Sequence, residues 1–226
     1  MTPEDRATAR IAELEADNRR LRRLLDQRDA PGELRHRLRS TVSLLRAIIR
    51  QSARTPRNPD DFADHVEGRL DAIARAQAEA DERGAIDLHK LIADELLQYG
   101  SHEGDGLTLS GPAICLQPRA GQLFALAVHE LAVNSIEHGA LAAGGQIEAE
   151  WGIAEGSEGP VLTFRWREEL EKGLRQGEHG GFGTYVLTRM LQYELGATTH
   201  LEKGPDGVSF AMSLPFTERV GSLSEG

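Results

Sequence analysis

His36 is the side chain in this sequence best placed for chemistry on another molecule. It lies early in a helix-patterned segment, and at about 100° per residue the apolar residues fall on one arc with His36 opposite. That arc consists of Leu34, Leu38, Thr41, Val42, Leu45, Ile48 and Ile49. Ser40, Ser43 and Ala47 follow on the histidine's own side, where small residues let a partner's backbone approach. The pattern predicts a solvent-exposed imidazole, with an ordinary surface histidine as the alternative.

Two carboxylates and an amide share one face of a second predicted helix. Glu130, Asn134 and Glu137 are spaced i, i+4 and i+7, so their side chains converge. Hard oxygen ligands of this kind suit Mg²⁺ that is held jointly with substrate phosphates. A solvated charged face is the alternative that the spacing leaves open.

A predicted strand carries an aromatic residue and an acid on one side. Leu162, Phe164, Trp166 and Glu168 alternate along it and therefore face the same way. Trp166 would give a flat apolar wall to a purine ring, and Glu168 an acceptor for its exocyclic amine. A core Trp next to a surface Glu is the equally simple alternative.

A glycine-rich segment opens the last predicted helix. Gly181, Phe182, Gly183 and Thr184 follow one another there. Glycines let the backbone come close to a phosphate, and a helix N-terminus offers free N–H groups. A flexible turn is the alternative for so short a motif.

Composition narrows the class of protein. The 226 residues carry 26 Lys and Arg against 36 Asp and Glu, a formal charge of −10, which disfavours nucleic-acid binding. The single cysteine, Cys115, lies in an apolar context and is expected to be a buried core thiol. No leader or long apolar run is visible, so we expect a cytoplasmic protein without a membrane anchor.

Residues 1–30 are predicted to form a coiled-coil helix. Its core positions alternate in 3-4 spacing at Ile11, Leu14, Asn18, Leu21 and Leu25. An Asn at such a position selects a dimer in register, and a lone amphipathic helix is the alternative.

Residues 31–84 are predicted to form a helical hairpin. Helices of about 33–54 and 59–82 are joined by a turn in which Asn58 caps the second helix and Pro59 opens it. One hairpin cannot bury both of its faces, so we expect a homodimer held by a four-helix bundle.

Residues 85–216 have an α+β pattern, for which we expect one sheet against about three helices in a sandwich of roughly 130 residues. The predicted helices are 87–99, 118–141 and 184–195, and the predicted strands are 107–110, 114–117, 146–153, 161–167, 198–203 and 208–214. The Ser/Gly/Glu-rich tail, 217–226, is expected to be disordered.

The order of these motifs resembles the HWE family of histidine kinases. The family name refers to a His in the Asn-bearing helix motif and to a Trp-x-Glu in the next motif, which match His129, Trp166 and Glu168. Residues 181–196 are similar to the family's nucleotide-lid segment. The resemblance covers about 33–215 and implies a dimerisation and histidine phosphotransfer hairpin, followed by an α/β sandwich of the GHKL (Bergerat) ATP-binding type.

The resemblance also implies a role for each motif residue. His36 is the phosphoacceptor, Asn134 the Mg²⁺ ligand, and Glu130 its neighbour at the metal. Glu168 is the acid on the adenine side of bound ATP. The other residues expected around the nucleotide are His129, Glu137, Trp166, Gly181, Gly183 and Thr184. Arg37, beside the phosphoacceptor, can pair with the incoming phosphate.

The sequence differs from the family pattern at three places. Ser40 stands where an Asn is expected four residues after the phosphoacceptor. Glu137 replaces a basic residue that often follows the metal-binding Asn, and 170–172 read Leu-Glu-Lys in place of Gly-Gly-Pro. Since Glu137 adds negative charge near the triphosphate, weak ATP affinity is expected.

The function that these features predict is that of a two-component histidine kinase. It would phosphorylate itself on His36 from Mg·ATP and pass the phosphoryl group to an aspartate of a response-regulator receiver domain. One alternative is a phosphorelay protein whose ATP-binding domain is degenerate. Another, disfavoured by the histidine-bearing hairpin, is an anti-sigma-type partner-switching module.

Overall fold

A computed structural model gives the fold of residues 30–53, 59–170, 181–204 and 207–224. The chain divides into two compact units, 1–49 and 50–226, and each is described by itself. The predicted coiled coil, 1–30, therefore lies outside the described residues, except for residue 30.

The described part of the first unit is helix α2, Ala30–Ser52, which continues to the start of the second unit. Its helical state confirms the first helix of the predicted hairpin. On the predicted apolar arc, Val42 and Ile49 are each 50% exposed, whereas Ile48 is completely buried. The arc is therefore only partly open to solvent.

Helix α3, Pro59–Arg83, belongs to the second unit and confirms the second predicted helix. Proline at its first position and the acidic Asp60 and Asp61 in its first turn favour this start, because they suit the free N–H groups and the positive end of the helix dipole. The helix packs along α5, Pro118–His138. Its buried apolar residues are mostly small: Ala72, Ile73, Ala76 and Ala80.

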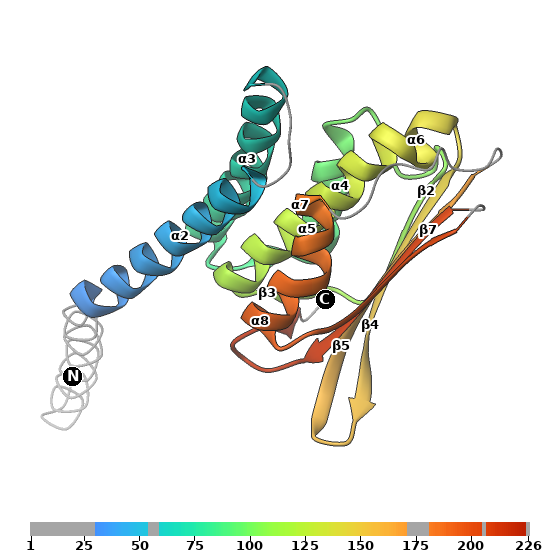
Figure 1. Ribbon diagram of the computed structural model, residues 1–226. Helices are drawn as coiled ribbons and strands as arrows, with labels where there is room; N and C mark the ends of the chain where they lie inside the picture. The colour runs from blue at the N-terminus through green and yellow to red at the C-terminus, as the bar shows by residue number, and fades with distance from the viewer. Residues whose placement is uncertain (1–29, 54–58, 171–180, 205–206, 225–226) are drawn as a thin grey trace, which may run out of the picture. The chain divides into compact units, whose positions relative to one another are not determined.

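A five-stranded sheet forms the base of the second unit (Figure 1). Its strands, in spatial order, are β2 Leu107–Ser110, β4 Gln146–Gly156, β5 Gly159–Glu169, β7 Gly207–Pro215 and β6 Thr198–Gly204. The first pair is parallel and the others are antiparallel. Each of these strands was predicted, and the buried residues alternate along β5 and β7 as a one-sided sheet requires.

Apart from α3, which packs on α5, the helices of this unit gather on one face of that sheet (Figure 1). They are α4 Leu88–Leu97, α5, α6 Ala140–Ala143, α7 Phe182–Tyr185, a π-helical turn η2 over Val186–Met190, and α8 Leu191–Leu195. Between the layers, Phe124 of α5 meets Phe164 of β5 edge to face, and Phe164 contacts Phe210 of β7. This aromatic core fixes α5 on the sheet and so positions its polar residues.

A second sheet corrects the single sheet that was expected. It has three antiparallel strands in the order β1 Ile86–Asp87, β3 Ile114–Leu116 and β8 Gly221–Leu223. The expectation that residues 217–226 are disordered is therefore wrong for residues 221–223, which form β8. Val220 is buried and Gly221 allows the strand to pair closely, since a Cβ there would lie 2.5 Å from the Cys115 carbonyl oxygen. Cys115 itself is half-buried on β3, not a fully buried core thiol.

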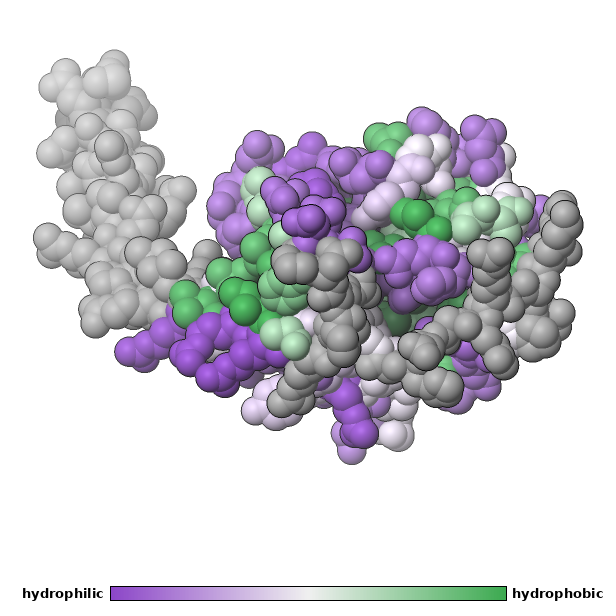
Figure 2. Space-filling model, turned by 45° about the horizontal axis from the view of Figure 1, so that its top comes forward, coloured by the Kyte–Doolittle hydropathy of each residue, from purple (hydrophilic) through white to green (hydrophobic). Residues whose placement is uncertain are grey.

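One face of the described part of the chain is largely polar (Figure 2). Figure 2 shows one face on which hydrophilic side chains predominate and apolar ones form small groups. Among the described helices, none combines the length and the apolar character needed to cross a membrane.

Candidate functional site

Two of the predicted oxygen ligands meet the glycine that opens the lid helix. A Cβ built on Gly183 would lie 2.8 Å from Glu130 Oε2 and 3.3 Å from Asn134 Nδ2. Only a glycine leaves the backbone of α7 room this close to α5. The structure therefore brings together three of the residues that the sequence analysis singled out, although they come from motifs some 50 residues apart along the chain.

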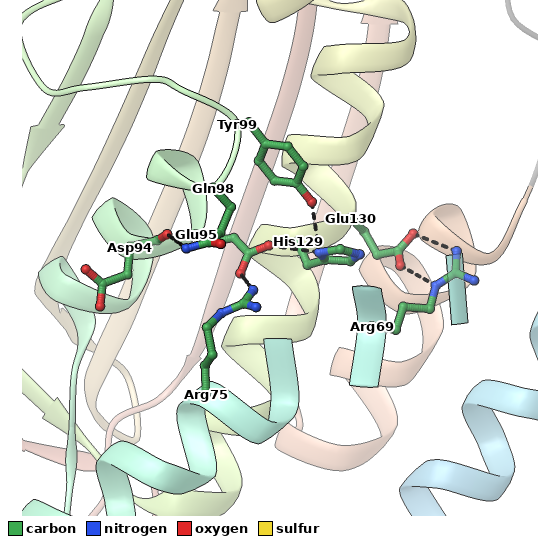
Figure 3. A network of polar contacts seen from close by, with 8 residues as sticks. All are labelled: Arg69, Arg75, Asp94, Glu95, Gln98, Tyr99, His129 and Glu130. Atoms are coloured by element: carbon green, nitrogen blue, oxygen red, sulfur yellow. Dashed lines mark hydrogen bonds and ion pairs between the residues drawn. The ribbon is translucent and has the colours of Figure 1, made fainter. Parts of the chain in front are cut away.

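Glu130 is also paired with a cation that the sequence analysis did not select. Arg69 of α3 donates from Nε to Glu130 Oε1 at 2.6 Å and from Nη2 to Oε2 at 3.3 Å (Figure 3). Its Nη1 donates to Ser52 Oγ at 3.0 Å. Arg69 is only 4% exposed and Glu130 3%, so this is a buried, two-point ion pair.

The segment similar to the family's nucleotide lid contacts the same cation. The guanidinium carbon of Arg69 lies 3.9 Å from the centre of the buried Phe182 ring. The helix that follows starts at Phe182, two residues before its predicted start, and passes through the π-helical turn η2. Such turns are frequent at functional sites because they shift the helix register locally. Gly181 has open space beside it. Thr184 is half-buried, and its backbone carbonyl accepts from Thr188 Oγ1 at 2.6 Å.

His129 points away from the lid, toward α4. Its Nδ1 lies 2.8 Å from Glu95 Oε1 and 3.2 Å from the Tyr99 hydroxyl, and Glu95 also accepts from Arg75 of α3 at 2.5 Å (Figure 3). A Cβ on Gly68 of α3 would lie 3.0 Å from the imidazole Cε1. His129 is therefore buried between α3 and α4, and its expected role at the nucleotide stays a prediction.

The His129 cluster shifts two ionisation equilibria. Burial by itself would raise the pKa of Glu95, but the hydrogen bond and charge of His129, with those of Arg75, outweigh it and hold that pKa below its usual value. Burial and the Glu95 charge raise the pKa of Tyr99 to about 12. Glu95 is therefore the charged centre of this cluster, and Tyr99 keeps a neutral hydroxyl beside the imidazole.

Trp166 and Glu168 form a buried pair on β5. Glu168 is 3% exposed, and its Oε1 accepts from Trp166 Nε1 at 2.9 Å. Its Oε2 accepts from Ser135 Oγ at 2.9 Å and from the Ala140 backbone N–H at 2.8 Å. The tryptophan has no exposed surface in this structure, as the alternative of a core Trp expects, and its expected role beside a purine stays a prediction. The pair joins β5 to the end of α5.

Glu137 lies on the side of α5 that faces α3. Its Oε1 is 3.3 Å from His65 Nε2, and its Oε2 is 3.6 Å from His138 Nε2. Of the three residues predicted to share a face, Glu130 and Glu137 both contact α3, through Arg69 and His65, and Glu130 and Asn134 adjoin the lid glycine.

The predicted phosphoacceptor lies on α2, as expected, but the side chains of His36 and Arg37 are outside the part that the structure describes. Their exposure and their roles stay predictions. In the described ranges, no cluster of three or more His, Cys, Asp or Glu side chains is arranged to hold a metal ion. Asn134 and Glu130 adjoin the lid glycine, and both oxygens of Glu130 are paired with Arg69, so their expected role as metal ligands stays a prediction.

One signal in the sequence could have identified Arg69. The apolar stripe of α3 alternates in steps of four and three: Phe62, Val66, Arg69, Ile73 and Ala76. A charged residue at a stripe position is buried only when it has a partner, so the pattern indicated a buried ion pair. Nothing in the sequence indicated which acidic residue would be the partner of Arg69 in that ion pair.

Comparison with solved structures gives the class of fold. The histidine kinase domain of the blue-light-activated histidine kinase EL346 from Erythrobacter litoralis superposes with a TM-score of 0.52 over 80% of this chain and 95% of that one, at 16% identity. The fold is therefore that of a histidine kinase domain.

Sequence comparison gives the family. The family model for the HWE histidine kinase matches residues 33–113. Blue-light-activated histidine kinase 1 of Erythrobacter litoralis is 31% identical over 173 residues, 73% of this chain and 47% of that protein. The blue-light-activated histidine kinase of Brucella ovis is 27% identical over 192 residues, 83% of this chain and 39% of that protein. The chain belongs to the HWE histidine kinase family, and it spans less than half the length of these relatives.

Proposed function

We propose that the protein is an ATP-dependent protein-histidine kinase that phosphorylates His36 and passes the phosphoryl group to an aspartate of a response-regulator receiver domain. The observation that carries the proposal is the meeting of Glu130, Asn134 and the lid glycine Gly183 in a chain that also has His36 on a helix. An acid, an amide and a closely approaching backbone are the groups that hold a metal-bound triphosphate.

The residues at this place fit Mg·ATP. Gly183 brings the lid backbone next to Glu130 and Asn134, because a Cβ there would lie 2.8 Å from Glu130 Oε2. Asn134 and Glu130 would hold the metal, which neutralises charge on the phosphates when it is bound. The amide is a neutral ligand, so it does not add to the repulsion between carboxylate and phosphate.

His36 supplies the nucleophile. Neutral imidazole is a competent nucleophile near pH 7. Its nitrogen lone pair forms the P–N bond while the bond from the γ-phosphorus to the bridging oxygen breaks, which leaves ADP. Phosphoryl transfer depends mainly on positioning and charge neutralisation, which Arg37 and the exposed Arg39 would assist as cations beside the acceptor.

The transferred group then leaves for a second protein. The receiver aspartate attacks phosphorus, the P–N bond breaks, and neutral His36 is regenerated. We also propose that the chain acts as a homodimer through α2, since Val42 and Ile49 leave apolar surface open on that helix.

Labelled ATP tests the proposal directly. Purified protein incubated with γ-³²P-ATP and Mg²⁺ should gain acid-labile phosphate, and His36→Ala should gain none. His200→Ala is a matched control, because His200 is an exposed histidine on β6 far along the chain from the acceptor. Label surviving in His36→Ala would reject that acceptor. Label arriving only from a phosphorylated receiver would favour the phosphorelay alternative.

A further inference from the structure

We propose that Arg69 is a latch that holds the nucleotide site closed while α3 is docked on α5. The latch is a regulatory device added to the proposed kinase function and rests on that function for its purpose. It is carried by the contacts of one buried guanidinium.

The Arg69 guanidinium joins three separate segments. It binds both carboxylate oxygens of Glu130 on α5, the Ser52 hydroxyl at the end of α2, and the Phe182 ring at the start of the lid. Each of its three nitrogen positions donates a hydrogen bond, and its flat face meets the aromatic ring. A side chain 4% exposed with this many partners has a specific geometry and is not a solvated surface charge.

While this pair exists, Glu130 is not available to a metal. Both of its oxygens are used by Arg69, and a guanidinium at this distance repels a second cation. The lid glycine also fills the space beside Glu130 and Asn134. Metal and triphosphate therefore need the pair to break and the lid to move, and both of these depend on one arginine.

The α3–α5 contact is of a kind that can open. Polar pairs run along it in antiparallel order: His65 with Glu137, Arg69 with Glu130, and Gln77 with Gln122. The apolar residues between them are mainly alanines, and Gly68 adds none. Little apolar area is buried, so separating the helices costs less than opening the aromatic core under the sheet. Moving α3 would withdraw Arg69 from Glu130 and Phe182 together.

The test compares two arginines of the same helix. Arg69→Met removes the cation from Glu130 and Phe182 and keeps most of the aliphatic bulk. Arg75→Met is the matched control, because Arg75 also pairs with a buried acid, Glu95, but contacts neither lid nor Glu130. Two measurements are made on the full chain: amide hydrogen exchange of residues 182–190 without nucleotide, and calorimetric titration with Mg²⁺ and a non-hydrolysable ATP analogue.

The latch predicts a specific pattern. Arg69→Met should speed exchange in 182–190 and tighten analogue binding, each by about tenfold, because the closed state no longer competes. Arg75→Met should change neither. Unchanged exchange in Arg69→Met would overturn the latch, and so would weaker analogue binding, which would make Arg69 a ligand of the phosphates instead.

Failure of the latch and failure of the kinase function can be told apart. If exchange quickens in Arg69→Met but no variant binds the analogue, the latch stands and the nucleotide function fails. If wild type binds and labels His36 but exchange is unchanged, the function stands and the latch fails. Should Arg69→Met not fold, Phe182→Leu removes only the ring from the guanidinium, and it should speed exchange in the same segment by a smaller factor. Unchanged exchange in that variant overturns the latch.

Discussion

Glu95 and His129 form a buried contact between α4 and α5, with 2.8 Å between Glu95 Oε1 and His129 Nδ1. The Tyr99 hydroxyl also contacts His129 Nδ1, and Arg75 of α3 donates to the second carboxylate oxygen of Glu95. His129, which matches the family's namesake histidine, thus lies in a buried cluster that connects α3, α4 and α5. Its neighbour Glu130 faces the other way, toward the lid.

The lowered pKa of Glu95 makes this cluster pH-sensitive. A carboxyl whose folded pKa lies below its unfolded value near 4.5 stabilises the fold above that value and loses this contribution as pH falls through the folded pKa. Glu95→Gln should therefore lower the free energy of unfolding at pH 7 by about 1–3 kcal/mol. The loss should shrink as the pH of urea unfolding is lowered below about 4.5.

A surface contact of the same length provides the control. Glu202 Oε1 lies 2.8 Å from His200 Nε2, and both side chains are about 70% exposed. Glu202→Gln should change unfolding by less than about 0.5 kcal/mol, since exposed pairs are screened by water. Equal losses in the two variants would show that burial does not strengthen the Glu95 contact.

The elements could be predicted from the sequence because each has its own local pattern. Pro59 with two acids starts α3, and alternation in β5 places Trp166 and Glu168 on the buried face. The short strand β8 could not be predicted. Its three residues carry no strand pattern of their own, and it forms because it pairs with β3.

The site was predicted in part for the same reason. Spacing along α5 brought Glu130 and Asn134 to one side, and a glycine motif indicated a close backbone approach. The partners of Glu130, Glu168 and His129 come from α3, α5 and α4 and depend on how those helices pack. Helix spacing alone carries no information about such pairs.

Gly183 should tolerate no side chain. In Gly183→Ala the new Cβ would lie 2.8 Å from Glu130 Oε2, and Arg69 prevents that carboxylate from turning away. We expect a loss of about 1–3 kcal/mol in the free energy of unfolding, typical of an overpacked site. Gly181→Ala is the control, because a Cβ there meets nothing within 4 Å. Equal urea midpoints for the two variants would contradict the crowding seen at the lid.

Glu168 should be required as a hydrogen-bond acceptor at both of its carboxyl oxygens. It accepts from three donors, and Glu168→Gln would turn an N–H₂ group toward at least one of them. The free energy of unfolding should fall by about 1–3 kcal/mol, with a change in the fluorescence of the buried Trp166. Glu169→Gln, one residue on and exposed, should leave both unchanged. A stable Glu168→Gln would indicate that water reaches this carboxyl.

The proposed dimer should depend on the apolar surface of α2. Val42→Lys with Ile49→Lys places two charges on positions that are half exposed in one chain and buried in a dimer. Light scattering at micromolar concentration should give twice the chain mass for wild type and the single mass for the double variant. Ser43→Lys, on a neighbouring exposed position, should remain dimeric. A wild type with the mass of one chain would exclude the dimer.

Charge near the metal ligands should set the affinity for nucleotide. Asn134→Ala removes the neutral oxygen ligand and should abolish Mg·ATP binding in calorimetric titration, whereas His138→Ala, one turn on and exposed, should not. Glu137→Lys should tighten binding by about tenfold because it removes a negative charge near the triphosphate and adds a positive one.

Glu137 also contacts His65 of α3, so the variant has a second effect. Glu137→Gln removes the charge while keeping the shape and a group that can still bond to His65. If binding tightens in Glu137→Gln, repulsion of the phosphates explains the weak affinity; if it tightens only in Glu137→Lys, loosening of α3 is the cause. If wild type binds nothing and neither variant restores binding, the domain is a scaffold, and His36 would receive its phosphoryl group from a receiver domain instead of from ATP.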